Sequence, residues 1–207
     1  SFPCQDEVVS PELQDLHEWV DSFFVSDQQV DASQQPDLIS QVEDSVGVGK
    51  HTSIGLDIFG NVHIRYYDEV NRDLKYAFWE RFFGTMIWTI ETVDFYNDQG
   101  GVGTYSSIAV DQSSRPHIAY MSEKYDDLKY ARRSSSGEWQ IYDVDKSDFH
   151  VGSYASLALQ EIGTSVYPHI SYLDFSSYDL KYAYVGTDLQ WKRQTLDTQG
   201  VVGLYTS

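Results

Sequence analysis

The chain has 207 residues, 41% of them hydrophobic and 15% aromatic, which is enough apolar material for one or two packed domains. Its 32 acidic and 14 basic residues give a formal net charge of −18. A chain with this charge repels nucleic acid and anionic membranes, so neither is an expected partner. No run of about 18 apolar residues is present, and we therefore expect no membrane-spanning helix.

The amino terminus reads SFPCQDE, without Met and without an apolar signal region. This start predicts a processed, mature protein that is extracellular or on the cell surface; an artificially trimmed start is the alternative. Cys4 is the single cysteine, so it cannot form a disulfide within the chain. A free thiol, a bond to another chain and a modification all remain open for it.

Residues 1–46 differ in composition from the rest and predict a helical segment followed by a linker. Ser10 is a candidate N-cap, and Pro11 suits the first position of a helix. Apolar residues then recur at helical spacing, at Leu13, Leu16, Val20 and Phe23. We expect one amphipathic helix over about 11–24, which either docks on the main domain or binds a partner.

The remaining domain, 47–207, repeats itself. The pentapeptide DLKYA occurs three times, at 73–77, 127–131 and 179–183. Similar segments precede each copy, for example VGTYSSIAVD and VGSYASLALQ, or PHIAYMS and PHISYLD. A Trp follows each copy, and an Asp follows each Trp. The repeats span about 48–101, 102–150 and 151–201, and 202–207 restarts the pattern.

Each repeat predicts four short antiparallel strands. Apolar residues alternate with a period of two, as Ile54 and Leu56 or Leu74 and Tyr76 do, and turn residues separate the segments. Four strands in about 50 residues, repeated along the chain, are typical of a β-propeller blade. We therefore expect an all-β propeller of three blades plus the start of a fourth, preceded by the N-terminal α-helical segment.

The repeat resembles bacterial propeller repeats of the type PHISYYD…DLKYA…W, which are distantly similar to sialidase/BNR-type propellers. The resemblance covers 48–207 and implies the propeller fold, whereas propellers serve many functions. Closed propellers need four to eight blades. We therefore expect that further chain or another copy completes the ring, and two copies would give six blades. The stop at Ser207, inside a predicted strand, favours a fragment.

Two sets of polar residues recur in every repeat and are predicted to be structural. The histidines are His63, His117 and His169. A hydrogen bond to the neighbouring blade is the expected role, and a ring of metal-binding imidazoles is the alternative. The aspartates that open the DLKYA segments are Asp73, Asp127 and Asp179. We expect them to cap turns, with calcium binding as the alternative, and we predict no cofactor.

The candidate ligand-binding residues are mainly aromatic. They are Trp88, Trp139 and Trp191 on the predicted fourth strands, Trp79 and Phe82 in the apolar run of the first repeat, and Arg65. Exposed indole rings can stack on sugars or cations, although packing between blades would equally explain their recurrence. The apolar run of the first repeat would alternatively contact the N-terminal helix.

The expected function is a non-catalytic secreted or surface β-propeller module for protein binding or structural assembly. The alternative is a lectin-like glycan binder with one shallow pocket between each pair of blades. The second alternative is part of a sialidase-like glycoside hydrolase. Such an enzyme needs a cluster of arginines, and Arg65 alone lies on a likely inner strand of this chain.

Overall fold

The structure, a computed structural model, describes residues 48–82, 85–95, 100–123, 125–146 and 150–204; the side chains of residues 80–82 and 86 lie outside this description. The described residues form three four-stranded antiparallel sheets, each with its strands hydrogen-bonded in chain order. Sheet 1 contains β1 (Val48–Leu56), β2 (Val62–Asp68), β3 (Asp73–Phe82) and β4 (Thr85–Asp94). Sheet 2 contains β5 (Val102–Val110), β6 (Pro116–Ser122), β7 (Asp127–Arg133) and β8 (Trp139–Asp145). Sheet 3 contains β9 (Val151–Ile162), β10 (Ser165–Asp174), β11 (Asp179–Val185) and β12 (Trp191–Asp197). The predicted all-β architecture of these repeats is confirmed.

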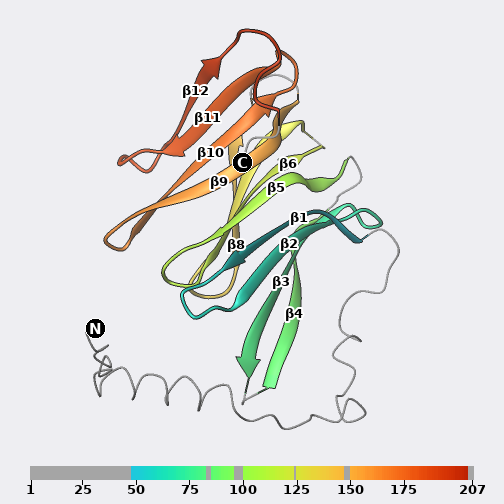
Figure 1. The fold of residues 1–207 in the computed structure, drawn as a ribbon, viewed down its shortest axis with the longest axis vertical. Helices are drawn as coiled ribbons and strands as arrows, with labels where there is room; N and C mark the ends of the chain where they lie inside the picture. The colour runs from blue at the N-terminus through green and yellow to red at the C-terminus, as the bar shows by residue number, and fades with distance from the viewer. Residues whose placement is uncertain (1–47, 83–84, 96–99, 124, 147–149, 205–207) are drawn as a thin grey trace, which may run out of the picture. The chain divides into compact units, whose positions relative to one another are not determined.

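The three sheets follow one another face to face (Figure 1). The first strand of each sheet packs on the preceding sheet, so β5 contacts β1, β2 and β3, and β9 contacts β5, β6 and β7. Each sheet therefore meets its neighbour through its first strand. The predicted N-terminal helix and its linker lie outside the described residues. Within the described residues, no helix has the length and apolarity that a membrane crossing requires.

The core consists of one apolar layer at each of the two junctions between sheets. The DLKYA segments explain both layers, because their alternate residues point to opposite faces. Leu74 and Tyr76 are fully buried and pack with Ile118 and Ala131 of sheet 2. Leu128 and Tyr130 pack in the same way with sheet 3. The Leu/Tyr face of each sheet thus meets the Ile/Ala face of the next one.

A glycine near the start of sheet 2, and another near the start of sheet 3, allow each of these sheets to approach the preceding sheet closely. Gly103 has a φ of +104°, and a side chain there would come within 2.9 Å of the Leu74 Cα. Gly152, with a φ of +98°, lies on Leu128 in the same way. The preceding valines, Val102 and Val151, each donate a backbone hydrogen bond to a turn carbonyl of the earlier sheet, at 3.0 and 2.9 Å. Glycine suits these positions because both the close approach and the positive φ disfavour a side chain.

In sheets 1 and 2, an aspartate at the end of the fourth strand bonds side chains of the next sheet, and we call it the junction aspartate. Asp94 accepts a hydrogen bond from the Tyr120 hydroxyl at 2.8 Å and lies 3.5 Å from the Lys129 ammonium. Asp145 is fully buried, and its Oδ2 lies 2.6 Å from the Tyr172 hydroxyl and 3.0 Å from the Lys181 Nζ. The equivalent in sheet 3, Asp197, is exposed.

This arrangement predicts unequal effects of removing two equivalent carboxylates. Asp145→Ala should lower the free energy of unfolding by about 2–3 kcal/mol, because it leaves the buried Tyr172 hydroxyl and the half-buried Lys181 ammonium without their main acceptor. Asp197→Ala should change it by less than about 0.5 kcal/mol, because this carboxylate is exposed. Urea unfolding of both variants and the unchanged chain provides the measurement. Equal effects of the two substitutions would contradict the role assigned to the junction aspartate.

Candidate functional site

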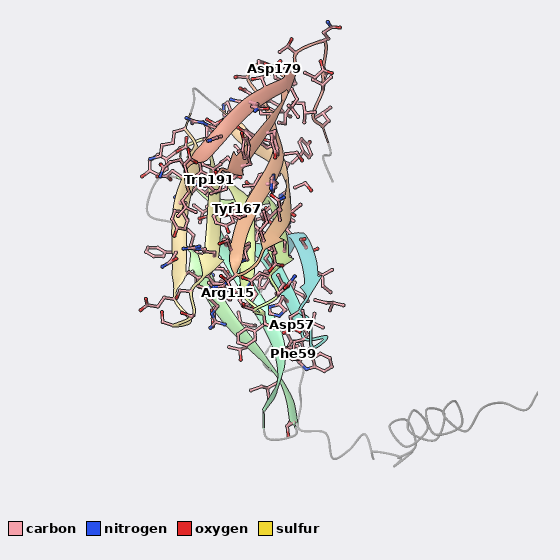
Figure 2. The ribbon with its side chains drawn as sticks, turned by 90° about the vertical axis from the view of Figure 1, so that its left-hand side faces the viewer. Asp57, Phe59, Arg115, Tyr167, Asp179 and Trp191 are labelled. Atoms are coloured by element: carbon pink, nitrogen blue, oxygen red, sulfur yellow. The ribbon has the colours of Figure 1, made fainter. Side chains whose placement is uncertain are left out.

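A pocket of about 400 Å³ lies between sheets 2 and 3, and we call it the junction pocket. Its lining includes Tyr130, Arg132, Tyr142, Leu189, Gln190 and Trp191. Tyr130 and Tyr142 lie on β7 and β8 of sheet 2, and Trp191 begins β12 of sheet 3. The turn between β11 and β12 supplies Leu189 and Gln190. Trp191 is among the residues labelled in Figure 2.

The aromatic and cationic groups of this pocket are held by one another. The rings of Tyr130 and Trp191 meet edge to face, with centroids 5.3 Å apart and an interplanar angle of 70°. The Arg132 guanidinium lies 5.5 Å from the centroid of the Tyr142 ring. Gln140 accepts hydrogen bonds from the Arg132 Nε at 3.0 Å and from the Tyr142 hydroxyl at 3.1 Å. Gln140 therefore links the cation and the ring, and all three side chains are exposed.

Leu189 at this pocket has an unusual backbone and exposure. It is 72% exposed, and its φ is 59°, in the left-handed region that disfavours a branched apolar residue. The corresponding turn of sheet 2 has Gly137, whose φ is 85°. Sheet 3 thus carries an exposed apolar side chain at a strained position that glycine would occupy without cost, which is a feature often found at functional sites.

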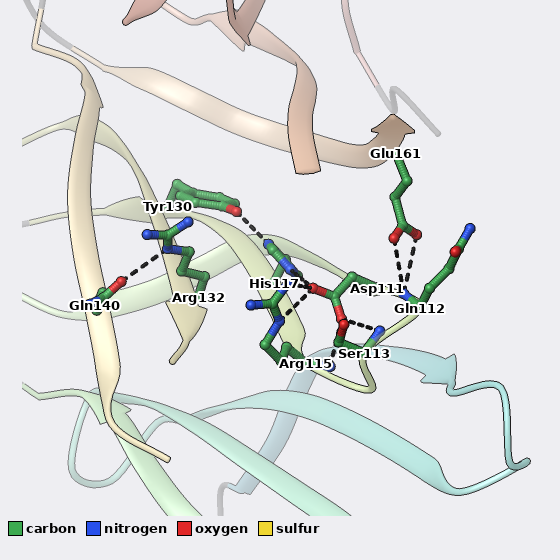
Figure 3. A network of polar contacts seen from close by, with 9 residues as sticks. All are labelled: Asp111, Gln112, Ser113, Arg115, His117, Tyr130, Arg132, Gln140 and Glu161. Carbon is green, nitrogen blue, oxygen red and sulfur yellow. Dashed lines mark hydrogen bonds and ion pairs between the residues drawn. The ribbon is translucent and has the colours of Figure 1, made fainter. Parts of the chain in front are cut away.

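A buried polar network supports the pocket from behind (Figure 3). His117 contacts the Tyr130 hydroxyl through Nδ1 and lies 3.2 Å from the Asp111 Oδ2 through Nε2. Arg115 donates to the same carboxylate oxygen from Nε and Nη2, at 2.7 Å each. Burial lowers the pKa of His117, partly opposed by Asp111, and burial raises the pKa of Tyr130 well above its ordinary value. Both groups are therefore neutral near pH 7, and the network fixes the Tyr130 ring.

The repeated histidines share this geometry. His63 and His169 contact the tyrosine hydroxyls of their own sheets, Tyr76 at 2.6 Å and Tyr182 at 2.5 Å. The expectation that they bond the neighbouring blade is wrong, because β2–β3 pairing places the tyrosine beside the histidine within one sheet.

Carboxylates cap two kinds of turn. Asp68 accepts from the backbone amides of Val70 and Asn71, and Asp174 accepts from that of Ser176, so these side chains cap the turns that precede the DLKYA segments. Asp111 caps the turn between β5 and β6 through Ser113 and Arg115. The cap role predicted for Asp73, Asp127 and Asp179 stays a prediction. Among the described residues, no group of three or more His, Cys, Asp or Glu is arranged to hold a metal ion.

The junction between sheets 1 and 2 carries a smaller pocket of about 240 Å³, lined by Tyr76, Phe78 and Arg133 among others. Trp139, the equivalent of Trp191, packs edge to face on Tyr76 with centroids 5.2 Å apart. Its indole nitrogen donates to Glu91 at 3.0 Å, and Arg133 pairs with the same carboxylate at 2.5 Å. The polar groups around Trp139 are thus engaged with one another.

The other predicted ligand-binding residues lie away from these pockets. Arg65 is 3% exposed, and burial lowers its pKa to about 9. Trp79 and Trp88 stack with centroids 6.0 Å apart on the face of sheet 1 that points away from sheet 2. That face holds an apolar pocket of about 330 Å³ beside Trp88. Phe82 ends strand β3. The ligand-binding role of all these residues remains a prediction.

Several lining residues of the junction pocket were not singled out from the sequence. Tyr130 belongs to the repeated DLKYA motif, which predicts only a structural role, and Arg132 directly follows this motif. The sequence signal that could have pointed to this pocket is Leu189, because the third repeat has leucine where the second repeat has Gly137.

Comparison with known proteins gives limited information. No family model matches the chain, and no curated protein matches it. Among solved structures, the chain is similar to a fucose lectin from Kordia zhangzhouensis in complex with methyl-fucoside. The two share 15% sequence identity with a TM-score of 0.46, and the match covers 69% of this chain and 96% of the lectin chain. Values this low do not support an inference about ligand or activity.

The neutral histidine predicts a loss of stability in mild acid. The pKa of His117 is lowered by burial from 6.5, so protonation favours the unfolded chain. Its contribution is fully present above pH 6.5 and is lost as the pH falls below this value. We expect the melting temperature to fall between about pH 7.5 and 5.5, by about 2–4 °C for each kcal/mol lost.

His117→Gln should lower the melting temperature at pH 7.5 and also reduce its dependence on pH. The reduction should be partial, because burial also lowers the pKa of His51 and His63. Calorimetry at constant ionic strength measures both quantities. An unchanged pH dependence in this variant would contradict the assignment of a buried neutral imidazole.

Proposed function

We propose that the three sheets are blades of a β-propeller and that the chain is a secreted or surface module that binds a glycan in the junction pocket. The observation that carries this proposal is the pocket itself, in which two tyrosines, a tryptophan and a guanidinium line one cavity of about 400 Å³. The propeller assignment rests on the repeated four-stranded meanders and on their face-to-face stacking.

The lining suits a sugar ring for chemical reasons. The C–H face of a pyranose packs on an aromatic ring, and its hydroxyls need donors and acceptors with fixed directions. Trp191 and Tyr142 provide aromatic surface, while Arg132 and Gln190 provide polar groups beside it. Gln140 and Tyr142 contact Arg132, which favours an orientation of its guanidinium beside the pocket.

The same geometry favours binding over hydrolysis. The titratable groups behind the pocket, His117 and Tyr130, are neutral and engaged with each other. Arg65, the candidate from the sialidase-like interpretation, is buried at the other junction and does not line the junction pocket. A binding module is thus the simpler assignment.

A second candidate function, structural assembly, is supported by a different observation. The outer face of sheet 1 carries an apolar pocket and exposed side chains such as Ile54, which is 64% exposed. This function is independent of the glycan site.

The glycan proposal is tested by a glycan array followed by calorimetry with the strongest hit. Trp191→Ala should weaken binding about tenfold or more, because it removes an aromatic anchor worth at least ~1.4 kcal/mol. Phe95→Ala, which removes a 65% exposed aromatic ring outside the pocket, is the matched control. An array without hits, or equal affinities for the two variants, would refute the proposal.

A second test uses the strained leucine. Leu189→Gly should leave the melting temperature equal or raise it, because glycine adopts the φ of 59° without strain. The same substitution should weaken glycan binding by about threefold to tenfold, since it removes an apolar contact from the pocket. Gly137→Leu at the other junction is the reverse control and should lower stability. An unchanged affinity in Leu189→Gly would show that the leucine has no role in binding.

A further inference from the structure

Arg65 is a buried cation without a carboxylate partner among the described residues. It is 3% exposed, and its Nε and Nη1 groups have no hydrogen-bond partner there. Burial alone lowers its pKa to about 9, so the guanidinium stays charged at neutral pH. By contrast, Arg115, Arg133 and Arg193 each pair with a carboxylate. A buried charge is costly unless a group of opposite charge accompanies it.

The position of Arg65 on β2 directs its side chain toward sheet 2. Ile64 and Tyr66 line the apolar pocket on the outer face of sheet 1. Because side chains alternate along a strand, Arg65 and Tyr67 point to the opposite face. The equivalent of Arg65 in sheet 2, Ala119, belongs to the apolar cluster between sheets 2 and 3. Sheet 1 thus carries a cation where the next repeat has a small apolar residue.

A cavity of about 370 Å³ lies beside this face, between sheets 1 and 2, and we call it the polar pocket. Its lining residues are Lys50, His51, Tyr67, Glu69, Arg72, Thr104 and Glu123. Burial lowers the pKa of His51, and the charge of Arg65 lowers it further. Arg65 therefore lies close to the polar pocket, through which a small solute can approach it.

The polar pocket also contains a buried hydroxyl that lacks a partner among the described residues. Thr104 is 3% exposed, and its Oγ1 makes no hydrogen bond there. At the next junction the equivalent Ser153 donates to the Met121 sulfur at 3.5 Å, and Met121 is the equivalent of Tyr67. Two nearly fully buried side chains of the first junction thus have donors without acceptors, although buried donors are normally paired.

We propose that a small monovalent anion such as chloride binds between sheets 1 and 2, held by the Arg65 guanidinium and the Thr104 hydroxyl. Its charge compensates the buried guanidinium, and an ion that only accepts hydrogen bonds suits a site that offers donors. The burial of both side chains favours a small ion over a bulky one. The site lies at a different junction from the proposed glycan pocket and does not depend on it.

Thermal unfolding at constant sodium concentration and constant ionic strength tests the site, with chloride replacing the bulky anion gluconate. An anion that binds the folded chain alone raises the melting temperature. We expect chloride at roughly ten times its dissociation constant to raise it by about 3–5 °C relative to gluconate. The chain's net charge of −18 opposes anion binding in general, so such an increase indicates a local site.

Substitutions assign the effect to the proposed donors. Arg65→Met should abolish the difference between chloride and gluconate, because it removes the charge and keeps an unbranched side chain. Thr104→Val should weaken chloride binding about threefold or more, because it removes one donor. Arg193→Met removes a guanidinium that is 48% exposed, so it is the matched control and should keep the difference. Arg65→Ala replaces Arg65→Met if that variant does not fold, since the second repeat has Ala119 at this position.

Chloride NMR measures binding without reference to stability, because exchange with a protein site broadens the chloride resonance. We expect broadening with the unchanged chain and with Arg193→Met, and its loss with Arg65→Met. Equal melting temperatures of the unchanged chain in chloride and gluconate would overturn the proposal. A chloride response in Arg65→Met as large as that of the unchanged chain would do so as well.

Discussion

A carboxylate at the end of the fourth strand ties sheet 1 to sheet 2 and sheet 2 to sheet 3. Asp145 provides the clearest case, because it is fully buried and bonds both Tyr172 and Lys181 of sheet 3. An ion in this position is costly unless both partners are present, so the contact specifies the register between sheets as well as holding them together. Gly152, which lies against Leu128, is near the same end of the junction, because Leu128 pairs with Asp145.

The junction aspartate holds the sheets together at one end of the junction, and the junction pocket lies at the other end. The junction pocket is built from residues toward the opposite ends of the same strands, including Arg132 at the end of β7 and Trp191 at the start of β12. There the buried contact of His117 with Tyr130 supports the aromatic wall. The junction aspartate thus sets the distance between the sheets. The histidine network orients the Tyr130 ring that lines the pocket.

The sequence predicted the parts of this fold that depend on local periodicity. The alternation in segments such as DLKYA predicted the strands, and the structure confirms them. The junction aspartates were visible as a repeated Asp after each Trp, but their partners were not. Asp94 and Tyr120 are 26 residues apart in different sheets, and no periodicity links them. The junction pocket was equally hidden, because its lining combines residues from two sheets whose relative placement the sequence does not encode locally.

The repeats themselves separate what holds the junction from what distinguishes one pocket from the other. Tyr130 and Trp191 have the same identity as Tyr76 and Trp139, and both pairs meet edge to face. The residues around them change: Arg132 and Tyr142 of the junction pocket correspond to Phe78 and Glu91 at the other junction. At that junction Glu91 engages the Trp139 nitrogen, whereas the corresponding ring of Tyr142 packs against a cation instead. A constant aromatic frame with variable polar neighbours allows equivalent junctions to present different chemistry without disturbing the contacts on which the stack depends.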